Sequence, residues 1–218
     1  MVTPVLSAAA SHVGKVRASN QDSGYVGNHL FVVADGMGGH AGGDVASAIA
    51  VRHLRENDHS YQGVEAARDE LYHSILDAGK ALTEAVSEHP ELTGMGTTVS
   101  AMIRVGNQMV IAHIGDSRIY RLRNGVLEQI TADHTFVQRL VDSGRITPEE
   151  AAVHPRRSVL MRVLGDVQGE PELDIAIHDA LPGDRWMLCS DGLSGVVPPD
   201  VMERILTSNV PTEEAAEL

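Results

Sequence analysis

The sequence predicts an α+β fold, a layered sandwich formed by a single domain of 218 residues. Two observations carry this prediction. Apolar residues recur every three or four positions in segments near both ends of the chain, whereas in the middle they alternate with polar residues in short runs. Helices that bracket a mostly antiparallel region of strands are typical of helices packed on a sheet. The length suits one domain with its own hydrophobic core.

The first half of the chain predicts one strand and then two helices. The apolar run that begins at Leu30 predicts a strand that ends at Asp35. A helix is expected over residues 45–57, with Asp44 as its N-cap. A second helix is expected over residues 64–88, because one apolar stripe runs along it at helical spacing. The stripe consists of Val64, Ala67, Leu71, Ile75, Ala78, Leu82 and Val86.

The middle of the chain predicts an antiparallel meander. The segments "TTVSAMIRV" and "QMVIAHIG" are rich in strand-forming residues, and Gly106-Asn107 separates them as a turn. The segments "DSRIYRLR" and "VLEQI" follow, separated by Asn124-Gly125. Asn-Gly between two alternating runs is a strong signal for a hairpin.

The last third returns to helices and two further strands. A helix is expected over residues 136–143 with Gly144 as its end, and a short helix begins at Thr147, whose successor Pro148 is tolerated in a first turn. The segments "LDIAIHDAL" and "RWMLCS" predict strands, and residues 201–206 predict a helix. A final helix is expected to start with Thr212 as its cap.

Composition excludes several classes of protein. The net charge of −13 argues against nucleic acid as a partner, because phosphate backbones favour Lys and Arg. No apolar run approaches the ~18 residues that a membrane helix needs, and no basic residues precede the mildly apolar start as a signal peptide requires. The single cysteine, Cys189, rules out an intrachain disulfide. We therefore expect a cytoplasmic monomer without a membrane segment in this chain.

The glycine-rich stretch "VVADGMGGHAGGD" is open to two interpretations. Residues 36–41 formally match the dinucleotide fingerprint G-x-G-x-x-G/A, and Glu56 follows about 20 residues later. That fingerprint belongs to a βαβ unit of about 30 residues, whereas the next convincing strand here starts near Thr97. Asp35 would also place a negative charge beside the pyrophosphate. A dinucleotide-binding oxidoreductase therefore remains only a third hypothesis.

A metal site explains more of the pattern. Three aspartates, Asp35, Asp116 and Asp191, follow the ends of three apolar runs, each next to a glycine. Mg²⁺ and Mn²⁺ take carboxylate, carbonyl and water oxygens as ligands. A phosphatase with a cysteine nucleophile would need C-x5-R, but counting from Cys189 leads to Gly195. Cys189 is therefore interpreted as a small buried hydrophobic residue.

The chain resembles the metal-dependent Ser/Thr protein phosphatases of the PPM or type-2C family, in particular the bacterial subgroup. The segments that carry the resemblance keep the family's order and cover nearly the whole chain. They are "GKVRASNQDS", "FVVADGMGGHAGGDVAS", "GMGTTVSA", "HIGDSRIYRLRNG", "QITADHTFVQRLVDSGRITPEEAAVHPRRSVLMRVLG" and "LCSDGLSG". The resemblance implies an α-β-β-α sandwich of two mainly antiparallel sheets flanked by helices. It identifies residues 1–218 as one catalytic domain with a small mobile flap at about 135–164.

The resemblance also implies a role for each matching position. Asp35 would bridge two metal ions, with the Gly36 carbonyl on the second ion and Asp191 on the first. Asp22 would support metal-bound water, and Arg17 would hold the substrate phosphate. The catalytic set is thus Arg17, Asp35 and Asp191, with two or three ions of Mg²⁺ or Mn²⁺ as cofactors.

A third metal site is implied at Asp116, with Asp191 and Ser158. Gln21 stands where many members have Glu, and Met37 stands where some members have a His proposed as general acid. His40 lies nearby without a matching position in the family. The family ends with an Asp-Asn turn and a final strand, whose Asp is a ligand of the first metal. The expectation is therefore a domain cut before its last strand, with the C-terminal part missing.

The implied function is hydrolysis of phosphoserine and phosphothreonine in proteins by a metal-bridged hydroxide at a two-metal centre. Phosphorylated proteins would be the substrates, Ser/Thr kinases would be partners, and the activity would reverse kinase signalling. The alternative is a poorly active or inactive phosphoprotein-binding fragment of such a phosphatase. Metal-dependent hydrolysis of p-nitrophenyl phosphate distinguishes the two.

Overall fold

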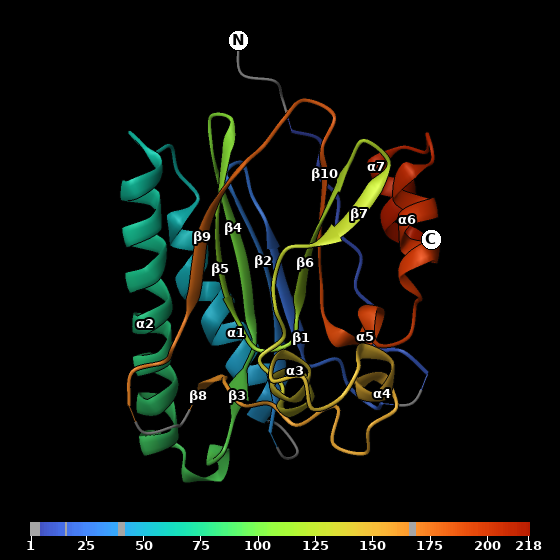
Figure 1. Cartoon of the computed structure of the whole chain (residues 1–218). Helices are drawn as coiled ribbons and strands as arrows, with labels where there is room; N and C mark the ends of the chain where they lie inside the picture. The colour runs from blue at the N-terminus through green and yellow to red at the C-terminus, as the bar shows by residue number, and fades with distance from the viewer. Residues whose placement is uncertain (1–4, 16, 39–41, 166–168) are drawn as a thin grey trace.

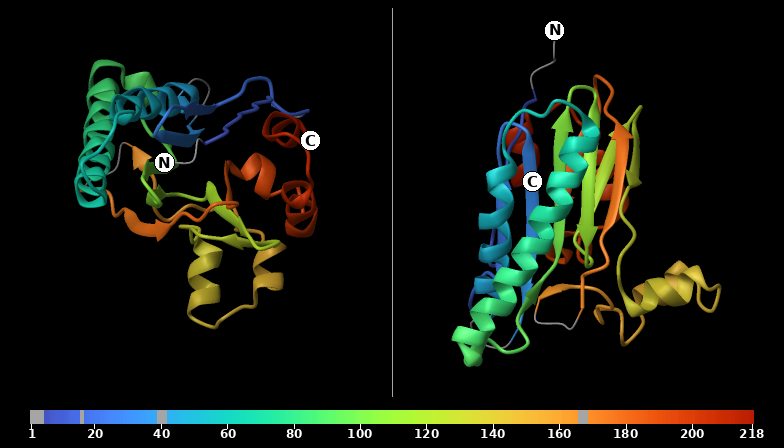
Figure 2. Two further views of the ribbon diagram at one scale, coloured as in Figure 1. Left: turned by 90° about the horizontal axis from the view of Figure 1, so that it is seen from above. Right: turned by 90° about the vertical axis from the view of Figure 1, so that its left-hand side faces the viewer.

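The computed structural model describes residues 5–15, 17–38, 42–165 and 169–218. Two antiparallel sheets lie face to face between helices (Figures 1 and 2), so the predicted α+β sandwich is confirmed. The larger sheet has the strand order β8-β3-β2-β4-β5-β9, with β1 paired to β2, and the smaller sheet has the order β10-β6-β7. The helices α1 and α2 pack on the larger sheet, and α6 packs on the smaller one.

The elements have the following bounds. The strands are β1 (Asp22–Val26), β2 (Leu30–Met37), β3 (Gly96–Thr97), β4 (Val99–Val105), β5 (Gln108–Ile114), β6 (Arg118–Arg123), β7 (Val126–Gln129), β8 (Leu164–Gly165), β9 (Asp174–Asp179) and β10 (Arg185–Cys189). The α-helices are α1 (Gly42–Leu54), α2 (Val64–Glu88), α3 (Phe136–Asp142), α4 (Pro148–Ala152), α5 (Asp191–Ser194), α6 (Pro199–Thr207) and α7 (Thr212–Glu217). Two 3-10 turns lie at η1 (Arg55–Asn57) and η2 (Pro90–Leu92).

Side chains of the larger sheet alternate between two hydrophobic cores. One face packs against α1 and α2, and Leu30, Val32 and the predicted stripe of α2 contribute to this core. The opposite face meets the smaller sheet, where Phe31 packs with Met102 and Ile119. Because both faces are buried, β2, β4 and β5 read as nearly continuous apolar runs.

Several local predictions were wrong, and the short elements β8 and α5 were not predicted. The strand β1 was missed, and β2 continues through Asp35 to Met37, since its last two residues pair with β3. The first helix begins at Gly42, so Asp44 lies in its first turn and bonds the Val45 N–H (2.9 Å) instead of capping the helix. At the C-terminal helix, Thr212 is the first helical residue, and Pro211 occupies the cap position.

The turn between β1 and β2 is held by one carboxylate. Asp58 accepts hydrogen bonds from the backbone N–H groups of Asn28 (3.0 Å), His29 (2.7 Å) and Leu30 (3.1 Å) and from the Tyr25 hydroxyl (3.0 Å). Burial alone would raise the pKa of Asp58, but these donors hold it below its ordinary value. The clamp therefore fixes the start of β2 and the register of β1 against it.

We expect Asp58→Ala to lower the free energy of unfolding by about 2 kcal/mol, because several N–H groups lose a charged acceptor. Urea unfolding at neutral pH measures the change, and Asp77→Ala on the exposed face of α2 serves as control. Folding lowers the pKa of Asp58. The stabilisation by its ionised carboxylate is therefore present at neutral pH and is lost as the pH falls through the folded-state pKa of Asp58. Equal stability of both variants would contradict the clamp.

Candidate active site

Four aspartates from separate elements gather at one end of the sandwich. Asp22 and Asp35 face each other as cross-strand partners on β1 and β2. Asp116 follows the end of β5, and Asp191 begins α5 immediately after β10 and its successor Ser190. This is the lower end of the sandwich in Figure 1, where α3, α4 and α5 also lie.

Mutual repulsion and burial dominate the electrostatics of this cluster. Burial raises the pKa of Asp35 to about 8, with further contributions from the charges of Asp22, Asp191 and Asp116. The side chains of Asp35 and Asp191 lie within hydrogen-bonding reach of each other. Burial also raises the pKa of Asp116 to about 6, together with the charges of Asp191 and Asp133. Within the described part of the chain, none of the four aspartates forms an ion pair.

Hydroxyl groups that the sequence analysis missed hold the cluster in place. The N–H of Asp35 donates to the Thr98 hydroxyl (2.9 Å), while its carbonyl accepts from the Thr98 N–H (2.9 Å) and the Thr97 hydroxyl (3.0 Å). The Ser190 hydroxyl donates to the carboxylate of Asp22 (2.7 Å). The Thr-Thr pair of "GMGTT" and the serine of "CSDG" are the only traces of these roles in the sequence.

Gly36 allows two backbone segments to approach closely beside Asp35. A Cβ at this position would lie 1.8 Å from the Gly43 carbonyl oxygen and 2.7 Å from the Gln21 carbonyl oxygen. The Gly36 N–H donates to that same Gln21 oxygen (3.1 Å). A side chain at residue 36 would therefore push β2 away from the N-terminus of α1.

The turn that carries Asp116 is anchored to the same network. Gly115 has a φ of 108°, and a Cβ there would lie 2.5 Å from the Thr98 side chain. The buried Ser117 hydroxyl bonds the Thr98 hydroxyl (2.7 Å), and the Ser117 carbonyl accepts from Ser100 (2.8 Å). Thr98 thus connects the backbone of Asp35 with the turn of Asp116.

Among the described residues, no hydrogen bond or ion pair joins the other predicted residues to this cluster. The side chain of Arg17 is exposed, and within the described residues it makes no hydrogen bond or ion pair. Ser158 is exposed on the segment 135–164, which projects from the sandwich (Figure 2). Met37 is 40% exposed at the end of β2, and His40 lies outside the described residues. Cys189 is buried, and burial raises its pKa to about 11, so its interpretation as a buried hydrophobic residue is confirmed.

The donor chemistry fits a hard divalent cation. Across residues 5–15, 17–38, 42–165 and 169–218, no three His, Cys, Asp or Glu side chains are placed to hold an ion jointly. Carboxylate and backbone carbonyl oxygens are nevertheless the ligands that Mg²⁺ and Mn²⁺ take. Four carboxylates that form no ion pair within the described residues also gain from a bound cation, which offsets their mutual repulsion.

No helix in the described part of the chain is both long and apolar enough to span a membrane.

Comparison with known sequences gives a consistent result. The model of the family described as "Protein phosphatase 2C" matches residues 10–217. The serine/threonine protein phosphatase PstP of Mycobacterium tuberculosis is 48% identical over 202 residues, which cover 92% of this chain and 39% of that protein. The serine/threonine phosphatase stp of Listeria monocytogenes is 40% identical over 213 residues, which cover 94% of this chain and 84% of that protein. The chain thus spans only about two fifths of the mycobacterial relative.

Solved structures agree with the sequences. The crystal structure of the M. tuberculosis phosphatase PstP has a TM-score of 0.90 at 46% identity and covers 96% of this chain and 88% of that one. The catalytic domain of PstP in complex with two manganese ions has a TM-score of 0.87 at 44% identity, and the match covers 96% of this chain and 87% of that one.

Proposed function

Because this chain belongs to the protein phosphatase 2C family, we propose that it hydrolyses phosphoserine and phosphothreonine in proteins with the help of Mg²⁺ or Mn²⁺. The observation that carries the proposal is the convergence of four aspartates without a basic partner among the described residues. Phosphorylated proteins are its proposed substrates, and the proposed activity reverses the action of Ser/Thr kinases. The similar catalytic domain of PstP, whose crystal structure contains two manganese ions, supports the choice of cation.

The aspartates have separate proposed roles. Asp35 and Asp191 would hold two cations, with the Gly36 carbonyl as a further ligand and Asp22 in support. Asp116, with Asp191 and Ser158, would hold a third. When bound, the cations supply the positive charge that lowers the pKa of the attacking water and offsets the charge of the phosphate.

The other residues of the site orient the aspartates or the substrate. Thr98 and Ser190 keep Asp35 and Asp22 in fixed orientations through the hydrogen bonds described above. Arg17 would hold the substrate phosphate, because a guanidinium can donate to two phosphate oxygens at once. The proposed reaction needs no covalent phosphoenzyme, and Cys189 is no candidate nucleophile because it is buried and burial raises its pKa.

Hydrolysis of p-nitrophenyl phosphate tests the proposal. We expect turnover in the presence of Mn²⁺ or Mg²⁺ that disappears with a chelator and returns when the cation is added back. Binding of a phosphopeptide without turnover at saturating Mn²⁺ would instead support the poorly active, phosphoprotein-binding alternative. One observation favours that alternative. Among the described residues, no group of three His, Cys, Asp or Glu side chains is arranged to bind one metal ion.

We expect Arg17→Ala to raise the KM for a phosphopeptide with a smaller fall in kcat, because the lost contact would be made in both the bound and the transition state. Steady-state kinetics at saturating Mn²⁺ measure the split. The exposed Arg52→Ala on α1 controls for the loss of a surface charge. An unchanged KM would return Arg17 to the role of an ordinary surface residue.

A further inference from the structure

His134 connects the turn of Asp116 to the base of the flap. Its backbone N–H donates to the Gly115 carbonyl (2.8 Å), and its ring Nδ1 accepts from the Gly115 N–H (3.2 Å). Gly115 is therefore held from both sides by one residue 19 positions away. Since Gly115 immediately precedes Asp116, His134 restrains the backbone of that aspartate together with the Thr98 network.

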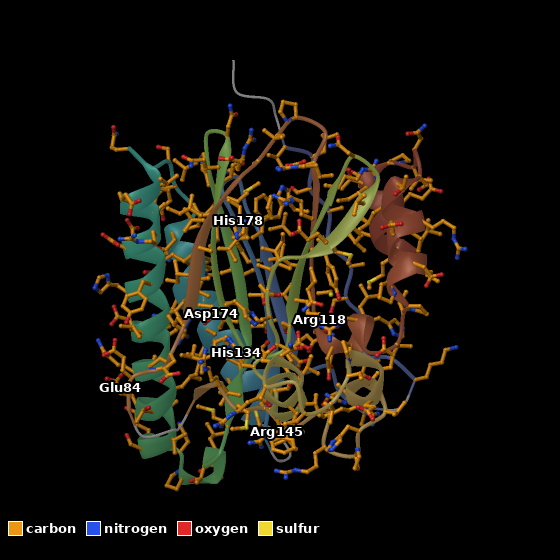
Figure 3. The ribbon with its side chains drawn as sticks, viewed as in Figure 1. Glu84, Arg118, His134, Arg145, Asp174 and His178 are labelled. Carbon is orange, nitrogen blue, oxygen red and sulfur yellow. The ribbon has the colours of Figure 1, made fainter. Side chains whose placement is uncertain are left out.

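The hydrogen bonds define the tautomer of His134. Nδ1 accepts a hydrogen bond from the Gly115 N–H, so the ring proton resides on Nε2. Nε2 donates to the Asp174 carboxylate (3.0 Å) at the start of β9. The His134 side chain is only 7% exposed, whereas Asp174 is 53% exposed. In Figure 3 the two residues lie next to each other below His178.

The backbone of His134 also joins the two ends of the flap. Its carbonyl accepts from the Met161 N–H (2.8 Å), and the next residue, Thr135, forms a bridge with Leu160 and caps α3. Arg162, just beyond this closure, donates to the other oxygen of Asp174 (3.2 Å). Both ends of the flap therefore meet at His134 and Asp174.

We propose that His134 is a positioning residue that couples the flap to the Asp116 turn through a fixed Nε2–H tautomer, with Asp174 as its anchor. The proposal rests on the proposed function, because it assigns to Asp116 a role in the reaction. A change of flap position would move His134 and with it the Gly115–Asp116 turn. Conversely, a ligand that orders Asp116 would order the flap base.

The neighbouring His113 does not share this arrangement. Its ring lies 4.8 Å from that of His134, but it bonds Ser100 (3.0 Å) and the Ala132 carbonyl (3.1 Å). It contacts neither end of the flap through these bonds. His113 thus bonds residues of the buried core, whereas His134 hydrogen-bonds both the Gly115 turn and the flap.

Two substitutions separate the two ring contacts. Asn at residue 134 keeps an acceptor near the Nδ1 position, so His134→Asn retains the bond from Gly115 and loses the bond to Asp174. Gln places its amide near Nε2, so His134→Gln keeps the link to Asp174 and loses the bond from Gly115. His178→Gln, on the same strand as Asp174 but next to Trp186, is the matched control.

Amide exchange in the metal-free protein is the first measurement. We expect the Gly115 amide to exchange roughly tenfold faster in His134→Gln, as the loss of about one hydrogen bond predicts, with little change in His134→Asn and the control. Long-range ¹H–¹⁵N spectra of the wild type should show the proton of His134 on Nε2. A proton on Nδ1, or equal Gly115 exchange in all variants, would overturn the proposal.

Kinetics then test the link to the reaction. The Mn²⁺ concentration for half-maximal turnover should rise several-fold in His134→Gln but not in the control, with the KM for p-nitrophenyl phosphate changed less. If both His134 variants unfold, Asp174→Ala should speed exchange both in α3 and at Gly115, because the tautomer of His134 loses its anchor. Unchanged exchange at Gly115 would contradict the coupling. An inactive wild type would reject the proposed function alone, because the exchange experiment needs no activity.

Discussion

Replacing Asp35 or Asp191 by Asn, each singly, is expected to lower phosphatase turnover on the order of a thousandfold, well beyond the 10- to 100-fold typical of a supporting residue. Both carboxylates lie in the acidic cluster, within hydrogen-bonding reach of each other. Asn keeps the shape of the side chain but removes the charge that a divalent cation requires. The fold should survive, because the change relieves repulsion within a buried set of like charges.

Turnover of one phosphopeptide at saturating Mn²⁺ measures the loss, and circular dichroism checks the fold of each variant. Asp200→Asn on the exposed surface of α6 is the control and should retain full activity. Comparable turnover by either cluster variant would remove the two-metal mechanism.

Gly36→Ala should cost both stability and activity. The added methyl group would overlap the Gly43 carbonyl, and that atom belongs to a helix backbone that cannot rotate away. Overpacking of this kind costs about 3 kcal/mol, and a displacement of about 1 Å at Asp35 can lower turnover roughly a hundredfold.

The matched control is Gly63→Ala, where nothing lies within 4 Å of a new Cβ and the backbone is extended. Thermal unfolding and turnover are measured for both variants. If Gly36→Ala were as stable and as active as Gly63→Ala, the close approach of β2 and α1 would be needed neither for stability nor for activity, which would contradict this prediction.

The layers of the fold could be predicted from the sequence, because a helix or strand that buries one face repeats apolar residues at its own structural period. The stripe of α2 is completely buried at five positions, and the short helix expected at Thr147 forms with Pro148 as its first residue. The strand β1 was missed because its five residues "DSGYV" carry little apolar signal. It becomes a strand by pairing with β2, a contact that no local pattern contains.

The candidate site was predictable in part. Asp35, Asp116 and Asp191 stood out because each follows an apolar run beside a glycine, whereas Asp22 and Arg17 came only from the family resemblance. Thr98 bonds Asp35 across 63 positions, and Ser190 bonds Asp22 across 168. Such contacts arise when distant segments come together in the fold, so the local sequence around Thr98 or Ser190 could not predict them.

Anomalous diffraction from crystals of this chain grown with Mn²⁺ tests the central claim most directly. We expect anomalous peaks within bonding distance of the Asp35 and Asp191 carboxylates, at about 2.0–2.3 Å from their oxygens. Crystals of Asp35→Asn grown in the same way should lose them. An active wild type without Mn²⁺ at these carboxylates would contradict the account.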